Sequence, residues 1–140
     1  MNQLTGMLQQ LPKSERLSGK INLDNLFTKG SSFIEYPLRI VYVITEKTDA
    51  STVKILPGVS KKRFKKAVDR NRIKRLIRES YRLNKAEITD HFHRQNKCIH
   101  IAFFCISPDL PEFGLVQKKM KNALSRIIEK TQIKNTDDKL

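Results

Sequence analysis

Apolar residues recur along this chain with two periods, and these predict strands and helices in mixed order. Residues 38–44 alternate between two faces, with the even-numbered residues on one face and Arg39, Val41 and Val43 on the other. Residues 99–106 are almost wholly apolar, which is typical of a buried strand. The predicted elements are a helix at 22–29, strands at 31–36, 38–44 and 53–60, a helix at about 64–84, a strand at 99–106 and a helix at about 112–131.

This order, α-β-β-β-α-β-α, predicts an α+β fold. The natural solution is a two-layer α/β sandwich, in which helices pack on one face of a mixed sheet. We expect residues 1–15 to form a flexible N-terminal tail, residues 16–131 one folded domain and residues 132–140 a C-terminal tail. Residues 85–97 are polar and predict a connecting segment or a continuation of the preceding helix.

Local signals mark the ends of the first helix and a break in the third strand. Asn22 is the expected N-cap, and Ile21 and Leu26 stand at the positions of a hydrophobic staple. Gly30 is expected to end the helix in a left-handed conformation. The pair at 57–58, Pro-Gly, interrupts the third strand and favours an edge strand or a bulge.

Positive charge is concentrated in one segment. The chain has 140 residues, with 28 Lys and Arg against 14 Asp and Glu, and a formal net charge of +14. Between residues 61 and 82 there are eleven basic residues and two acidic ones, so this segment alone carries +9. This concentration points to a polyanionic partner, nucleic acid before an anionic membrane.

Several other classes are excluded. The longest apolar run, residues 101–106, is too short to cross a bilayer. The first ten residues lack the basic and apolar regions of a secretory signal. Cys98 and Cys105 make no disulfide framework, and free thiols favour a reducing cytoplasm.

The basic segment is predicted to be an amphipathic helix that packs by one side. Ile73, Ile77 and Tyr81 share the apolar face with Leu76 and Ser80. Arginine predominates on the opposite face, and its planar guanidinium binds phosphate oxygens in pairs and stacks on bases, which favours structured nucleic acid. The basic residues of that opposite face are Arg70, Lys74, Arg75, Arg78 and Arg82.

The residues of this segment resemble a known family. Val59-Ser60-Lys61-Lys62, followed by Ala67-Val68-Asp69-Arg70-Asn71-Arg72-Ile73-Lys74-Arg75-Leu76-Ile77-Arg78, is similar to the signature of the bacterial ribonuclease P protein component. Arg16-Leu17, Phe27 and Gly30 match that family's first helix and turn. The resemblance covers about residues 16–131.

The resemblance implies both a fold and a function. The fold would be similar to the second domain of the fifth protein of the small ribosomal subunit, with a left-handed crossover. The function would be that of a cytoplasmic subunit that binds a catalytic RNA and the 5′ leader of precursor tRNA. The RNA would cleave the leader with Mg²⁺, which it would itself mainly hold. No organic cofactor and no further protein partner are expected.

The resemblance also implies two groups of site residues. The residues expected to face the RNA are Lys61, Lys62, Arg70, Asn71, Arg72, Lys74, Arg75, Arg78 and Arg82. Those expected to line a cleft for the leader are Phe27, Arg39, Val41 and Ser60. A floor of aromatic and apolar residues with flanking cations binds single strands without demanding sequence.

Other chemistry is less well supported. The acidic residues are scattered, without the converging carboxylates of a two-metal nuclease, so no catalytic residue is assigned to the protein. His91, His93, Cys98 and His100 could supply zinc ligands, but loop histidines and a core cysteine are the preferred interpretation. Four large apolar residues could form a binding stripe, but their spacing is that of a hydrophobic core, where we expect them: Phe103, Phe104, Phe113 and Met120.

Two alternatives remain open. One is a general RNA-binding module, ribosome-associated or an RNA chaperone, without a processing role. The other is binding to a membrane surface, which would require the basic helix to expose its apolar face.

Overall fold

The computed structural model describes residues 11–46 and 51–139, with side chains described as far as residue 132. Most elements lie where the sequence pattern predicts them, and one helix is additional. The elements are η1 (Lys13–Glu15), α2 (Lys20–Lys29), β1 (Ser31–Glu35), β2 (Leu38–Glu46), β3 (Val53–Val59), α3 (Ala67–Asn84), α4 (Ala86–Gln95), β4 (Lys97–Cys105) and α5 (Phe113–Lys139).

Four strands form one mixed sheet in the order β1-β2-β4-β3. β2 pairs antiparallel with β1 and with β4, whereas β3 pairs parallel with β4. β4, the most apolar strand of the sequence, is therefore central and is buried along nearly its whole length. The strand that contains Pro57 and Gly58 lies at an edge, as predicted.

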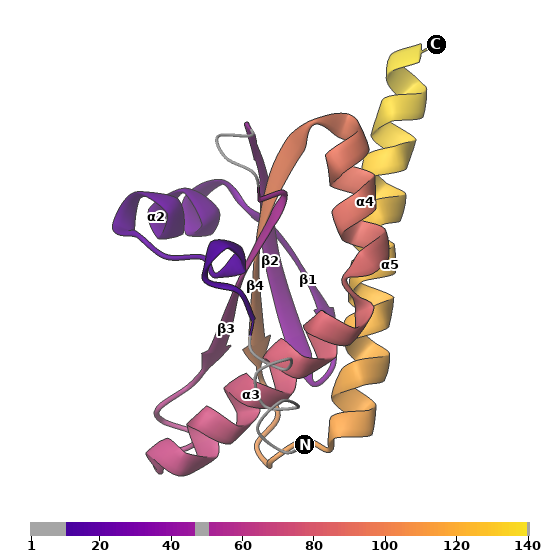
Figure 1. Ribbon diagram of the computed structural model, residues 1–140. Helices are drawn as coiled ribbons and strands as arrows, with labels where there is room; N and C mark the ends of the chain where they lie inside the picture. The colour runs from indigo at the N-terminus through magenta and orange to yellow at the C-terminus, as the bar shows by residue number, and fades with distance from the viewer. Residues whose placement is uncertain (1–10, 47–50, 140) are drawn as a thin grey trace.

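The two faces of the sheet are covered differently. α3, α4 and α5 pack on one face, where Ile40, Ile101 and Ile77 belong to the larger hydrophobic core. α2 lies on the other side of the sheet (Figure 1), where Leu26 packs with Val41 and Ala102. The expectation that all helices share one face is wrong for α2, because β2 and β4 carry apolar side chains on both faces.

Residues 85–97, predicted as a polar connection or a continuation of the preceding helix, contain a separate helix, α4. Ile88, His91 and Phe92 are buried at helical spacing against the sheet and α5. The polar residues that hide this pattern face solvent. The helix ends at Asn96, whose φ of 55° is left-handed.

The predicted tails are partly ordered elements. Leu11 is buried in the core, Glu15 pairs with Lys85 of the α3–α4 junction at 2.9 Å, and Leu17 donates to the Ile55 carbonyl of β3. Residues 11–15 are therefore anchored at their two ends, while residues 1–10 lie outside the described part. At the other end, α5 continues through the predicted tail to Lys139.

The first helix begins and ends differently from the prediction. It starts at Lys20, after Gly19 at a φ of 93°, and Asn22 donates to the Ser18 carbonyl instead of capping. Ile21 is 84% exposed, so it forms no staple. Gly30 has a φ of −73°, so it is not left-handed as predicted. A glycine is required there for another reason: a Cβ would lie only 2.3 Å from the Leu26 carbonyl oxygen.

Candidate nucleic-acid interface

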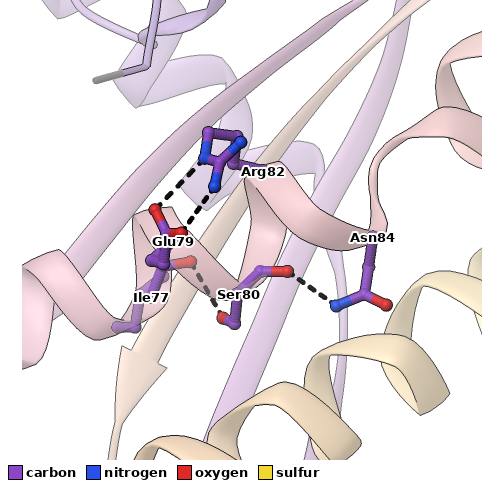
Figure 2. A network of polar contacts seen from close by, with 5 residues as sticks. All are labelled: Ile77, Glu79, Ser80, Arg82 and Asn84. Atoms are coloured by element: carbon purple, nitrogen blue, oxygen red, sulfur yellow. Dashed lines mark hydrogen bonds and ion pairs between the residues drawn. The ribbon is translucent and has the colours of Figure 1, made fainter. Parts of the chain in front are cut away.

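The basic helix α3 is held on the domain by the apolar stripe that its sequence predicts. Ile73, Ile77 and Tyr81 are almost completely buried, and Ser80 is buried with them. Figure 2 shows two hydrogen bonds on the buried side: Ser80 Oγ donates to the Ile77 carbonyl at 3.0 Å, and Asn84 Nδ2 donates to the Ser80 carbonyl at 2.7 Å. The apolar face is therefore not available to insert into a membrane.

The opposite side of α3 presents cations to solvent. Asn71, Arg72 and Arg75 are exposed, and Lys74 and Arg78 are half-buried. We call these five residues the α3 surface. Lys61 and Lys62, in the turn that follows β3, are also exposed.

Arg70 is bonded within the protein. The helix begins at Ala67, not at 64 as predicted, and buried Phe64 belongs to the preceding loop. Arg70 Nη1 donates to the Phe64 and Lys65 carbonyls, each at 2.8 Å. Its guanidinium therefore fixes the basic loop against the first turn of α3.

Arg82 is also engaged. Its guanidinium donates to both carboxylate oxygens of Glu79, at 2.6 and 3.1 Å, on the side of the helix away from Ser80 and Asn84 (Figure 2). These hydrogen bonds raise the pKa of Arg82. Because its charge is balanced locally, Arg82 contributes less to an outward cationic field than the exposed arginines do.

Arg16 adds a charge that the helical pattern could not reveal. Burial lowers the pKa of Arg78, and the positive charges of Arg16 and Arg75 lower it further. Arg16 is exposed and donates through Nε to the Leu11 carbonyl. Its position depends on the pairing of the N-terminal segment with β3, so only the family resemblance singled it out.

The residues expected to line a cleft come from α2 and from the α2 side of the sheet. Phe27 is 51% exposed, and Arg39 is exposed on β2. Val41 is 7% exposed and packs with Leu26 of α2, so it supports this surface from below. Ser60 is exposed just beyond β3, where its Oγ accepts from the Lys62 amide at 3.2 Å.

Phe104 belongs to this same surface, contrary to its assignment to the core. Its ring centroid lies 5.9 Å from that of Phe27, and the residue is half-buried beside the smaller hydrophobic cluster that contains Leu26 and Val41. Phe103 and Met120 are fully buried in the larger core, as predicted, and Phe113 is half-buried at the start of α5. We call Phe27, Ile34, Arg39, Gly58 and Phe104 the α2-side surface.

The four candidate zinc ligands lie on two different elements, the histidines 91 and 93 on α4 and the pair 98 and 100 on β4. Within the described side chains, no three His, Cys, Asp or Glu residues come close enough to hold a metal ion together. His91 is buried on α4, not in a loop, and its Nε2 lies 2.6 Å from Thr131 Oγ1 of α5. Cys98 and Cys105 are buried, and neither forms a disulfide with a described residue.

A search for membrane spans covered the part of the chain that the structure describes. None of the helices found there combines the length and the apolar character that crossing a bilayer requires.

Comparison with known proteins gives consistent matches along most of the chain. The family model for ribonuclease P matches residues 11–128. The ribonuclease P protein component of Porphyromonas gingivalis (strain ATCC 33277) is 43% identical over 117 residues, which cover 84% of this chain and 85% of that protein. The protein component of Chlorobaculum tepidum is 39% identical over 92 residues, 60% of each chain.

Solved structures share the fold. The ribonuclease P protein of Thermotoga maritima aligns with a TM-score of 0.63 at 24% identity and covers 80% of this chain and 96% of its own. That of Staphylococcus aureus aligns with a TM-score of 0.61 at 23% identity, with 82% and 96% covered. The α+β sandwich around a mixed four-stranded sheet is thus common to all three chains.

Proposed function

The chain belongs to the ribonuclease P protein family and is the protein component of this tRNA 5′-processing endoribonuclease, and from this premise we propose that its two exposed surfaces bind two different RNA segments. The α3 surface binds the catalytic RNA. The α2-side surface binds the single-stranded 5′ leader of precursor tRNA.

The observation that carries the first assignment is the set of exposed hydrogen-bond donors on α3. Arg72 and Arg75 are exposed beside Asn71 on a helix whose other side is buried. Guanidinium groups on a rigid helix can pair with successive phosphates at little entropic cost. Arg70 acts behind them as a positioning residue, because it fixes the loop that carries Lys61 and Lys62.

The second assignment rests on the combination of aromatic rings and cations. Exposed Phe27 offers a ring face to a base, and Arg39 and Lys61 can neutralise leader phosphates. Stacking on rings accepts any base, which suits leaders that differ among tRNAs. Val41 and Ser60 shape the floor and the end of the same surface.

The chemistry of cleavage is assigned to the RNA partner. The described carboxylates do not gather into a group that could hold a metal, so we infer that the Mg²⁺ ions of the assembly are held mainly by RNA. The protein supplies positive charge that favours the folded RNA and holds the substrate. It needs neither an organic cofactor nor a further protein partner, and its two buried thiols suit the reducing bacterial cytoplasm.

The test is cleavage of a precursor tRNA by a bacterial ribonuclease P RNA at low Mg²⁺, with and without this protein. Near-stoichiometric protein should restore the rate, and Arg72→Ala combined with Arg75→Ala should abolish that rescue. Arg94→Ala removes an exposed arginine from α4, where it pairs with Asp90, and should leave the rescue intact.

The competing assignment is a general RNA-binding module. Such a module would bind mature and leader-bearing tRNA equally, and it would not restore cleavage. Absence of rescue by wild-type protein that still binds tRNA tightly would overturn the proposal in favour of that module.

A further inference from the structure

We infer that Phe104 is a second base-stacking residue of the α2-side surface and that Gly58 is the position that makes room for its ring. The inference rests on the leader-binding role proposed above, and it adds to that role a determinant from the central strand. Its ligand is a nucleobase of the single-stranded 5′ leader.

The sheet register places Phe104 in the middle of an exposed row. Arg39 of β2 stands directly opposite Phe104 on one side, and Gly58 of β3 stands opposite it on the other. Ile34 of β1 extends the row beyond Arg39 and is 57% exposed. Residues paired in this way share one face of the sheet, so these four positions form a continuous line across all four strands.

The neighbouring row shows what full coverage by α2 looks like. There, Val41 and Ala102 are paired and are both buried under Leu26. Phe104 lies one row further along the same face and keeps part of its ring in solvent. The helix therefore covers one row and leaves the next row accessible beside Phe27.

Gly58 is matched to the ring of Phe104. A Cβ at residue 58 would lie 2.3 Å from Phe104 Cδ1 and 2.4 Å from Cε1. The Cδ1–Cε1 edge of the ring thus occupies the space in which any other side chain at residue 58 would begin. Gly58 therefore makes room for the ring, and Phe27 lies against it, so that its orientation is set before any ligand arrives.

Phe27 and Phe104 together form an aromatic site, with one ring from α2 and the other from β4. Their centroids are 5.9 Å apart with an interplanar angle of 40°, which leaves the two faces splayed and not closed on each other. Arg39, exposed beside Phe104, is placed to pair with the phosphate of a stacked nucleotide. A fixed ring costs little conformational entropy on binding, which favours stacking.

The test compares affinities of the reconstituted holoenzyme for precursor and mature tRNA. Phe104→Leu keeps an apolar side chain on β4 but removes the ring, and it should reduce the preference for precursor about tenfold. Gly58→Ala should reduce it as well by displacing the ring, and it should add little once residue 104 is Leu. Phe33→Leu makes the same change on the opposite face, under Arg126, and should leave the preference unchanged.

A leader without bases separates stacking from packing. Against a precursor with abasic leader nucleotides, wild type and Phe104→Leu should bind equally. If Phe104→Leu weakens binding of the abasic precursor as much as that of the normal one, the ring acts only through packing and the inference is wrong.

Two further outcomes identify which proposal fails. If Phe27→Leu reduces the preference and Phe104→Leu does not, the stacking role of Phe104 is overturned while the leader surface stands. If neither variant changes the preference, the leader surface itself is wrongly assigned.

A fluorescent variant gives an independent measurement should Phe104→Leu fail to fold. The chain contains no Trp, so Phe104→Trp introduces a single indole at the site. Its emission should be quenched by precursor tRNA but not by mature tRNA. Equal emission with both RNAs would contradict the inference.

Discussion

Arginines that look equivalent in the sequence have different roles in the structure. Arg70 and Arg72 flank Asn71, yet one guanidinium is bonded to two backbone carbonyls and the other is exposed. Arg82 is bonded to Glu79 three residues earlier. The sequence could predict which face of α3 is basic, but the bonding of Arg70 depends on a loop whose path only the folded chain defines.

This difference makes a testable prediction about stability. Arg70→Lys replaces a planar group that reaches two carbonyls by a single ammonium, so it should lower the free energy of unfolding by about 1–2 kcal/mol. Arg72→Lys keeps the charge at an exposed position and should change it by less than about 0.5 kcal/mol. Urea denaturation measures both, and equal stability of the two variants would contradict the positioning role of Arg70.

At the scale of elements, the helix α4 shows how a polar surface conceals a buried face. Glu87, Asp90 and Arg94 dominate the segment, so the three buried residues between them resemble a loop composition. One of the buried residues is His91, which bonds across to α5. Burial lowers the pKa of His91, the nearby charge of Arg94 lowers it further, and Asp90 partly opposes both.

The direction of that shift predicts how stability responds to acid. The unfolded chain, with an ordinary histidine pKa of about 6.5, takes up a proton before the folded chain does. The contribution of neutral His91 is therefore present above that pH and is lost as the pH falls below it. Thermal unfolding between pH 7 and pH 5 should show a steeper loss for wild type than for His91→Gln, which does not titrate. Parallel curves would contradict the prediction.

Two glycines at helix ends predict opposite responses to a methyl group. At Gly30 a Cβ would collide with the Leu26 carbonyl and lie 3.0 Å from the Tyr42 carbonyl, whereas at Gly114 nothing lies within 4 Å. Gly30→Ala should therefore cost about 1–3 kcal/mol of folding free energy. Gly114→Ala, in the first turn of α5, should be neutral or stabilise by up to about 0.5 kcal/mol. Chemical denaturation of both variants checks this, and tolerance of Ala at 30 would be inconsistent with the close approach.

At the scale of the whole molecule, the net charge of +14 is distributed on a scaffold with two distinct faces. The larger core lies between the sheet and three helices, while the smaller cluster lies under α2. The α3 surface and the α2-side surface thus lie on different sides of one sheet, as the proposed binding of two RNA segments at once requires.

Salt dependence should separate the two surfaces. Removing Arg72 and Arg75 should flatten the slope of log affinity for the catalytic RNA against log salt by about 1–2. Phe104→Leu, which removes no charge, should leave the salt dependence of precursor binding unchanged. Filter binding at several salt concentrations measures both slopes, and an unchanged slope for the double arginine variant would argue against phosphate contacts on α3.

The sequence predicts the features that depend on the local spacing of apolar residues. It fails where the outcome depends on which face of a strand or helix is covered by the rest of the fold. β1 and β3 lie within one residue of their predicted ends, and the buried stripe of α3 is confirmed. Phe104 was assigned to the core because it and Phe103 are both apolar in a strand covered on two faces, where alternation carries no signal. The anchoring of residues 11–15 and the position of Arg16 depend on contacts with β3 and the α3–α4 junction, which no local pattern encodes.

The central position of β4 has a consequence for how the protein is made. β2 and β3 both need β4 as a partner, yet β4 is synthesised after them, beyond the entire basic helix. At roughly 5–20 residues per second, β3 waits on the order of seconds for the strand that joins it to the β1–β2 pair. During that interval α3 has no completed sheet to bury its apolar stripe, while its cations are already exposed to the RNA-rich surface of the ribosome. Completion of β4 is therefore the step that lets the four-stranded sheet form, and α5, which is synthesised last, then closes the larger core.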